Sequence, residues 1–540
     1  MPRPAGLKTH LSDLKAAPAV ALLLFSSSAL QASTLDDIGV TVLRAVTTNL
    51  NGSGIRVAHP EASLSANSPI WEVNAGYFPQ LAGRFTYTSS LGSTNGFPNL
   101  LGTDSWHAND VANYFYGMPS GVATNVAEVD NYDAEFYVTN YVFNLLPAAG
   151  EPVVNQSYTF GNVSTNLPTP TNYLSVSDQQ GIDSAYDDYA AANGTLFISA
   201  VNNGGSVSPP GTDYNCIGVG AYGGSSSVGP TLDNGRCKPD LTAPAGATSF
   251  STPQVAGAAA VLLQAARRGD GGSDTNAASD LRTIKALLLN GAVKPPGWTN
   301  GNATPLDARH GAGVVNVFNA YEQLAGGKQI FCASNLVAGG GDHPPVADTN
   351  FVSASSGWDF ESIASDAADD AVNHYFFNVP NGMATATLVW NRPFGQTNAD
   401  RLINDLDLFL FDAANSNLVA CSTSRVDNVE HLFVPRLPAG RYDLQVLKNG
   451  GTNVVSDTEA YALAWGFVSP ALSIAKTGTN AVLTWPVYPA GFRVEAATNL
   501  VSSAWSPNNL PAAALTNSMN SLQLNATNAA QFFRLRQPNF

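Results

Sequence analysis

The feature that most constrains the fold is an alternation between short apolar runs and stretches with helical spacing, which extends from residue 34 to about residue 328. Ile55–Ala58 and Leu196–Ala200 are apolar runs of strand length, whereas Asp183–Ala192 and Pro253–Arg268 have the spacing of helices. Strands that alternate with helices are typical of an α/β fold built on a mostly parallel sheet. The sequence therefore predicts an α/β layered domain over this part of the chain.

The pattern changes after a Gly/Pro-rich segment, Ala338–Pro345, which indicates a domain boundary. Beyond it, Thr385–Trp390, Leu406–Phe411 and Tyr442–Val446 are strand-like and separated by turn residues, as in an antiparallel β-sandwich. Short strand-like runs continue to the end of the chain and predict a further small β module. The predicted organisation is a signal peptide over residues 1–32, an α/β domain over 33–330, a linker over 331–350, a β-sandwich over 351–468 and a C-terminal β module over 469–540.

The N-terminus has the order of a secretory signal peptide. Basic residues precede an apolar run, Ala16–Phe25, and small residues follow over Ser26–Ala29, so the sequence indicates cleavage after Ala29 or Ala32. The apolar run is too short to span a bilayer as a helix, and no later stretch is long and apolar enough. A buried N-terminal helix is the alternative. We expect the mature protein to be exported, as a secreted or cell-surface protein without a membrane span.

Charge and cysteine content limit the partners and the covalent structure. Acidic residues outnumber basic ones, 41 against 25, which gives a formal net charge of −16. Nucleic acids and anionic membranes repel such a chain, so we expect neither as a partner. The four cysteines are too few for a disulfide framework. An oxidising destination permits Cys216–Cys237 or Cys332–Cys421 bridges, and free buried thiols are the alternative.

Three short segments carry residues of catalytic type. Glu61 follows a glycine turn and a strand, so it would lie at the carboxyl edge of the sheet; taken alone, it is better explained as a solvated loop carboxylate. His107 precedes a run with helical spacing and can face a cleft, with a capping or packing histidine as the alternative. Ser249 lies just before Pro253, which suits the first turn of a helix, where the positive helix end favours a developing anion. An N-cap serine is the alternative.

Taken together, the segments resemble the subtilisin-like serine proteases (subtilases) over roughly residues 35–325. Thr-Ser-Phe-Ser-Thr-Pro-Gln-Val-Ala-Gly, preceded by Lys-Pro-Asp-Leu-Thr-Ala-Pro, is similar to the family's serine motif and puts the nucleophile on Ser249. His-Ala-Asn-Asp-Val-Ala puts the general base on His107, and the strand and turn Phe197–Gly204 put the oxyanion-hole asparagine on Asn202. The resemblance implies a subtilisin-like parallel-sheet catalytic domain that hydrolyses peptide bonds through an acyl-enzyme.

The acid position departs from the family. Subtilases carry Asp-Thr-Gly after the first strand, where this chain has Glu61-Ala-Ser63. A glutamate can still orient and stabilise an imidazolium, because the role needs a carboxylate beside the ring. The resemblance therefore implies a triad of Glu61, His107 and Ser249. Val153–Tyr158 resembles an edge strand on which the family lays an extended substrate.

The β-sandwich carries a possible metal site. Its strand motifs resemble the sandwich that follows the catalytic domain in some secreted bacterial subtilases, where it can bind calcium. Asp405 and Asp407 alternate on a strand and share a face, and Asp427 and Glu430 could complete a set of hard oxygen ligands for Ca²⁺. Acidic surface and turn chemistry is the alternative. The expected hydrolysis itself requires no cofactor.

The sequence thus favours a monomeric secreted serine endopeptidase that acts on protein or peptide substrates. The Glu61 exchange keeps open a second interpretation, a catalytically weak or inactive subtilase-fold protein that binds or adheres through its β modules. A third interpretation, glycan binding, needs exposed aromatic platforms. Trp465, Trp485 and Trp505 are the candidates, and we expect them to be core residues instead.

Overall fold

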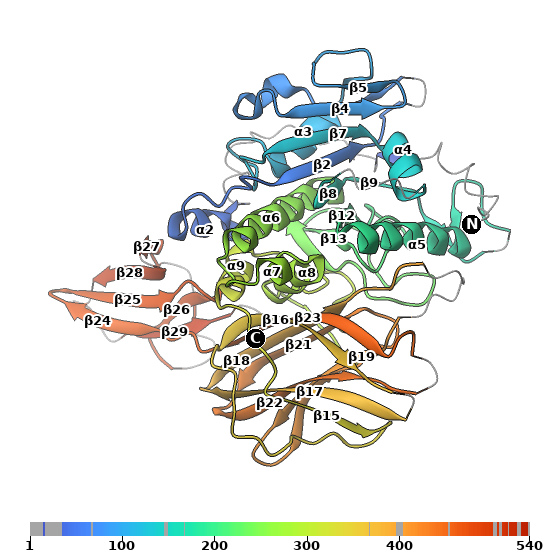
Figure 1. Cartoon of the computed structure of the whole chain (residues 1–540). Helices are drawn as coiled ribbons and strands as arrows, with labels where there is room; N and C mark the ends of the chain where they lie inside the picture. The colour runs from blue at the N-terminus through green and yellow to red at the C-terminus, as the bar shows by residue number, and fades with distance from the viewer. Residues whose placement is uncertain are drawn as a thin grey trace.

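An eight-stranded sheet forms the centre of the α/β domain in the computed structural model (Figure 1). Its strand order is β14-β13-β12-β8-β2-β7-β4-β5, and all neighbours pair in parallel except the β4–β5 hairpin. The α/β fold with a mostly parallel sheet that was predicted from the sequence is confirmed. The strands are β2 (Arg56–Glu61), β4 (Phe85–Ser89), β5 (Gly92–Thr94), β7 (Glu128–Asp133), β8 (Val153–Gln156), β12 (Leu196–Ala200), β13 (Ile217–Tyr222) and β14 (Leu241–Pro244).

Helices cover both faces of this sheet. Val57 and Val153 lie in the same apolar cluster as α6, whereas Ala58 and Val154 lie in the cluster that contains α5, as expected for alternating strand residues. Gly257 of α6 lies against Val122, and a Cβ at this position would be 2.5 Å from Val122 Cβ, so only glycine allows this close approach. The helices are α2 (Val40–Val46), α3 (Trp106–Phe115), α4 (Ala134–Tyr137), α5 (Val176–Asn193), α6 (Thr248–Arg268), α7 (Thr275–Ala278), α8 (Leu281–Asn290) and α9 (Val317–Ala325).

The structure describes most of the chain, with short gaps. Apart from Lys15 and Ala16, the signal peptide predicted over residues 1–32 lies outside the described residues. None of the described helices is long and apolar enough to cross a membrane. Shorter elements are β1 (Lys15–Ala16), β3 (Ile70–Glu72), β6 (Thr103–Asp104), β9 (Tyr158–Thr159), β10 (Val163–Ser164), β11 (Leu174–Ser175), the 3₁₀ turns Ala75–Tyr77 and Pro79–Leu81, and a π-helical turn, Val138–Val142. The described residues are 15–16, 35–65, 68–144, 150–166, 168–366, 368–395, 403–451, 454–500, 505–506, 510–516, 518–525 and 531–537.

Two antiparallel sheets form the sandwich that follows (Figure 1). Their orders are β15-β17-β22-β19-β20 and β16-β23-β18-β21. Ala333–Ala338, within the segment predicted as a linker, forms edge strand β15 of the first sheet, so that part of the linker prediction is wrong. The remaining strands are β16 (Ser356–Ala364), β17 (Asp369–Val379), β18 (Gly382–Trp390), β19 (Leu406–Asp412), β20 (Asn417–Ser422), β21 (Val429–Leu437), β22 (Gly440–Lys448) and β23 (Thr458–Val468).

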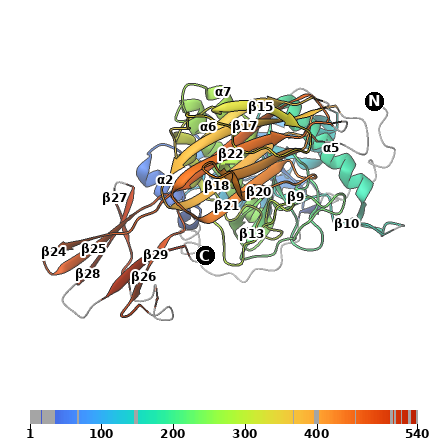
Figure 2. The same cartoon turned by 90° about the horizontal axis from the view of Figure 1, so that it is seen from below.

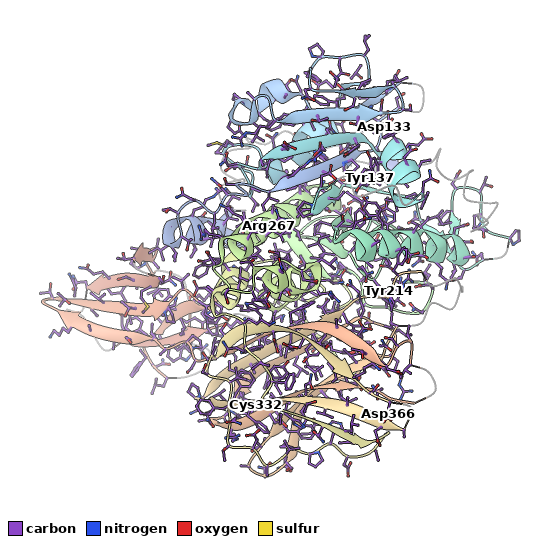
Figure 3. All side chains as sticks on the ribbon, viewed as in Figure 1. Asp133, Tyr137, Tyr214, Arg267, Cys332 and Asp366 are labelled. Carbon is purple, nitrogen blue, oxygen red and sulfur yellow. The ribbon has the colours of Figure 1, made fainter. Side chains whose placement is uncertain are left out.

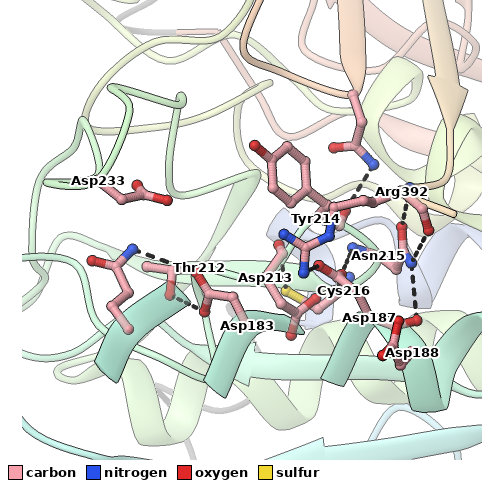
Figure 4. A network of polar contacts seen from close by, with 12 residues as sticks. Asp183, Asp187, Asp188, Thr212, Asp213, Tyr214, Asn215, Cys216, Asp233 and Arg392 are labelled. Carbon is pink, nitrogen blue, oxygen red and sulfur yellow. Dashed lines mark hydrogen bonds and ion pairs between the residues drawn. The ribbon is translucent and has the colours of Figure 1, made fainter. Parts of the chain in front are cut away.

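A buried polar network joins the sandwich to the α/β domain (Figure 4). Asn215 and the backbone of Arg392, just after β18, exchange two hydrogen bonds of 2.9 and 3.1 Å. The Arg392 guanidinium lies 2.5 Å from Asp187 of α5, and both side chains are almost fully buried. The Tyr214 carbonyl accepts hydrogen bonds from the side chains of Lys285 and Asn428. Figure 3 shows Tyr214 at the level where the α/β domain and the sandwich meet. The sandwich is therefore fixed on the α/β domain by specific buried contacts.

The C-terminal strands form a separate projection (Figure 2). Trp485 lies in its small apolar cluster and Trp465 in the sandwich core, with 5% and 0% of their surface exposed. Trp505 packs under the guanidinium of Arg534, 4.5 Å from the ring centre. Trp465 and Trp485 are thus core residues and form no glycan platform. The strands of the projection are β24 (Ser473–Thr477), β25 (Asn480–Pro486), β26 (Arg493–Ala497), β27 (Ala514–Thr516), β28 (Met519–Asn525) and β29 (Phe532–Arg536).

All four cysteines are described, and all four are free thiols. Cys332, labelled within the sandwich in Figure 3, precedes edge strand β15, whereas Cys421 lies on β20 at the opposite edge of the same sheet. Cys216 and Cys237 are buried without a bridge. Of the two alternatives, the structure has the free thiols.

Candidate active site

Glu61 is the last residue of β2, at the carboxyl edge of the parallel sheet. Its side chain is completely buried, so the solvated loop carboxylate considered from the sequence is excluded. His59 lies two residues earlier on the same strand, and the two side chains therefore project from the same face. A buried carboxylate is stable as an anion only where partners compensate for the lost water.

His107 is the partner of one oxygen of this carboxylate. It is the second residue of α3, a helix whose start is fixed because Ser105 caps it and accepts a hydrogen bond from Ala108 N–H. His107 Nδ1 lies 2.7 Å from Glu61 Oε1, and the ring is 1% exposed. The structure thus brings together two of the residues selected from the sequence, although 46 residues separate them.

The electrostatics of this pair favour an ionised carboxylate and a basic imidazole. Burial alone would raise the pKa of Glu61, but the charge and hydrogen bond of His107, together with His59, lower it below the ordinary value. Burial alone would lower the pKa of His107, but the charge and hydrogen bond of Glu61 raise it above the ordinary value. The pair therefore has the properties of a general base held by an acid.

Ser249 is the second residue of α6, close to His107. The ring of Phe250, the next residue, has its centre 5.8 Å from the centre of the His107 ring. Ser249 Oγ donates to the carbonyl of Ser157 at 3.4 Å, and Ser157 Oγ donates back to the carbonyl of Ser249 at 2.9 Å. His107 Nε2 has no hydrogen-bond partner. The first turn of α6 thus contacts the His107 ring through Phe250, and no hydrogen bond links Ser249 to His107 in this conformation.

The asparagine beside the serine turn is Asn203, one residue after the one selected from the sequence. Asn203 Oδ1 accepts hydrogen bonds of 2.8 Å from both the backbone N–H and the hydroxyl of Thr248, and its buried Nδ2 has no partner. The side chain of Asn202 donates instead to Asn162 and Ser208. Asn202 has φ = 95°, a left-handed conformation that favours glycine or asparagine. The choice of Asn202 is therefore corrected to Asn203.

The four carboxylates selected for calcium are not assembled as a metal site. Among the residues that the structure describes, no group of three or more His, Cys, Asp or Glu side chains is arranged to hold a metal ion. Asp427 accepts hydrogen bonds from Cys237 N–H and the Ser424 hydroxyl, and Glu430 accepts from Ser422 and from Ser424 N–H. Asp407 accepts from Asn449, whereas Asp405 Oδ1 has no partner. Calcium binding at these four residues stays a prediction.

Comparison with known proteins agrees with the fold. Residues 115–313 match the model of the subtilase family, a range that includes Asn203 and Ser249. Among solved structures, the chain is similar to the serine protease of Aeromonas sobria in its complex with a chaperone, with 13% identity, a TM-score of 0.38, and 86% of this chain and 98% of that chain covered. It is also similar to tripeptidyl peptidase 2, with 14% identity, a TM-score of 0.29, and 81% and 52% covered. The match to the family model confirms the resemblance found in the sequence motifs over residues 115–313.

Proposed function

We propose that this protein is a secreted serine endopeptidase that uses Glu61, His107 and Ser249. The single observation that carries the proposal is the buried pair of Glu61 and His107, 2.7 Å apart, whose free Nε2 lies beside the first turn of the helix that bears Ser249. A buried histidine with one ring nitrogen on a carboxylate and the other unpartnered is the arrangement of a general base. The export part of the proposal rests on the N-terminal sequence pattern alone.

In the proposed reaction, the Ser249 hydroxyl turns from the Ser157 carbonyl to His107 Nε2. Such hydrogen bonds are often long or absent without substrate and form in the complex. Ser249 Oγ attacks the peptide carbonyl carbon while His107 takes its proton, and Glu61 stabilises the resulting imidazolium. His107 then gives the proton to the leaving amine. Water attacks the acyl-serine in the same way, with His107 again as the base, and releases the acid and the free serine.

The negative charge on the carbonyl oxygen needs hydrogen-bond donors. Asn203 Nδ2 is one, because it is buried and unpartnered while the other end of its amide is fixed by Thr248. The backbone N–H of Ser249 is the second, because N–H groups in the first turn of a helix have no partner within that helix. The positive end of α6 adds to their effect.

The substrate is expected to bind as an added strand along Ser157–Thr159. β8, which precedes this segment, lies inside the sheet between β12 and β2, so it is not the edge strand that we predicted. The chain leaves the sheet after β8, and β9 pairs in antiparallel fashion with Lys15–Ala16 of β1. A segment next to Ser249 that accepts an extended strand supports recognition of peptides by their backbone.

One observation favours the alternative, an inactive scaffold that binds through its β modules. Ser249 Oγ is bonded to the Ser157 carbonyl and not to His107. The two functions are separated by labelling the folded protein with a fluorophosphonate, which reacts only with an activated serine, with and without added calcium. The proposal predicts labelling of the wild type and none of Ser249→Ala. Folded wild-type protein that stays unlabelled under both conditions would refute the peptidase and leave the scaffold.

A further inference from the structure

A second histidine lies against the acid of the proposed triad. His59 Nε2 is 3.4 Å from Glu61 Oε2, the oxygen that does not contact His107. Both side chains are completely buried, and neither of these two atoms has a hydrogen-bond partner, so the 3.4 Å contact is an approach of two unsatisfied atoms that is not yet a hydrogen bond. The carboxylate of Glu61 thus lies between two imidazole rings, one on each oxygen. The mechanism described above uses only one of them.

The other ring nitrogen of His59 fixes which atom carries the proton. His59 Nδ1 is 2.9 Å from the hydroxyl of Tyr116, the residue that caps the end of α3. Burial raises the pKa of Tyr116 well above its ordinary value, so the hydroxyl keeps its proton and can donate it to Nδ1. A neutral His59 ring that accepts at Nδ1 carries its hydrogen on Nε2, the atom that lies 3.4 Å from the carboxylate. The opposite tautomer would place a lone pair against a buried anion.

The backbone of His59 is fixed as firmly as its ring. Asn131, its neighbour on β7, donates to the His59 carbonyl and accepts from Val73 N–H, both at 2.8 Å. His59 and Glu61 therefore have a set spacing along one rigid strand, and Tyr116 connects them to the same helix that carries His107. A histidine held by Tyr116 at its ring and by Asn131 at its backbone is suited to position the group that it faces.

We propose that His59 is a positioning residue that donates from Nε2 to Glu61 Oε2 and holds the other carboxylate oxygen on His107. This inference rests on the proposed function and deepens it. It explains how a glutamate replaces the family's aspartate: the longer side chain has an extra torsion, and a donor on its second oxygen removes that freedom. The chain Tyr116–His59–Glu61–His107 then orders the base before substrate binds.

Loss of His59 has a predictable effect on protonation. The groups around the pair are few: Tyr116 and Tyr158 face Glu61, Asp110 of α3 faces His107, and Asp133 pairs with Glu61 across β7. The carboxylates are acceptors, the Tyr158 hydroxyl lies on Gln156 and accepts its amide hydrogen, and the Tyr116 hydroxyl lies at His59 Nδ1, so none of these groups donates to Glu61 Oε2 in the structure. Without His59, the Glu61 anion is less stabilised, and the pair binds a proton more tightly. The pKa of His107 should rise.

The test uses the full chain and two variants of the same residue. His59→Leu removes the donor, whereas His59→Gln restores an amide N–H near the position of Nε2. The fluorophosphonate labelling rate should fall about 10- to 100-fold in His59→Leu, as expected for a lost hydrogen bond to a charged group. The acid limb of the pH profile of this rate should move to higher pH. His59→Gln should recover most of both. His431→Leu, which removes an equally buried histidine from β21, should leave the acid limb in place.

A second readout does not depend on activity. In protein with ¹⁵N-labelled histidine and the Ser249→Ala exchange, nuclear magnetic resonance reports the tautomer of His59 and the titration of His107. We expect His59 protonated at Nε2, and a raised His107 pKa in His59→Leu or, where that variant does not fold, in Tyr116→Phe. A hydrogen on Nδ1 of His59 alone, or an unchanged titration of His107 in a folded variant, would overturn the inference. An unlabelled wild type with the expected tautomer and titration would refute the peptidase but leave the positioning role intact.

Discussion

The length of the acid side chain can be tested separately from its charge. Glu61 Oε1 is 2.7 Å from His107 Nδ1, and both side chains are buried. Glu61→Asp keeps the charge but withdraws the carboxylate by one carbon–carbon bond, about 1.5 Å. Since a misplacement of ~1 Å can reduce a rate ~100-fold, we expect Glu61→Asp to lower the labelling rate by about 100-fold.

Glu61→Gln makes the opposite change, because it keeps the length and removes the charge. Its amide can donate to Nδ1 of His107 and so select the tautomer that has a hydrogen, and no lone pair, on Nε2. The corresponding exchange in a serine protease lowers kcat by ~10⁴, so we expect the glutamine variant to be slower than the aspartate variant. The assay is the second-order rate of fluorophosphonate labelling above the pKa of His107, with thermal unfolding as the control for folding. A Glu61→Asp variant as fast as the wild type would refute the reasoning from distance.

Three further predictions concern other parts of the account. Asn203→Ala should lower the labelling rate by about 10²–10³-fold through loss of an oxyanion donor. Asn202→Gly should keep the wild-type labelling rate, because glycine suits the positive φ of residue 202. Equal losses in the two variants would contradict the assignment of the oxyanion donor to Asn203. His107 must be neutral to accept a proton, so its raised pKa places the acid limb of labelling above pH 6.5, and a limb below that value would count against the ion pair with Glu61. Arg392→Met should reduce the free energy of unfolding by about 3–5 kcal/mol, because it leaves the buried carboxylate of Asp187 unpaired. Urea denaturation measures this loss. A loss below about 1 kcal/mol would show that the network does not hold the sandwich in place.

Local motifs were sufficient to predict much of the site. Glu61 at the end of its strand and His107 at the start of its helix lie where the sequence places them. The start of α6 differs from the prediction, because the helix begins at Thr248, so that Ser249 lies within the first turn and Pro253 lies beyond it, inside the helix. The positions of Glu61 and His107 follow from short-range rules, since strand ends and helix caps are encoded within a few residues. The burial of Glu61 against His107 is what distinguishes the pair from a surface carboxylate and a capping histidine.

The parts that sequence reasoning missed depend on backbone angles and on long-range neighbours. The shift from Asn202 to Asn203 follows from a positive φ, although a pair of asparagines before Gly204 was a usable signal. The interior place of β8 depends on strand order, which spacing along the chain does not contain. His59 was visible on the strand of Glu61, but its role depends on Tyr116, which lies far away in the sequence.

The most direct test of the account is a crystal structure of the protein after reaction with a fluorophosphonate. We expect phosphorus on Ser249 Oγ and the phosphoryl oxygen within hydrogen-bond distance of Asn203 Nδ2 and Ser249 N–H. His107 Nε2 should be directed at the adduct, with Glu61 still on Nδ1. An adduct on another residue, or a phosphoryl oxygen bound by Asn202 and out of reach of Asn203, would contradict it.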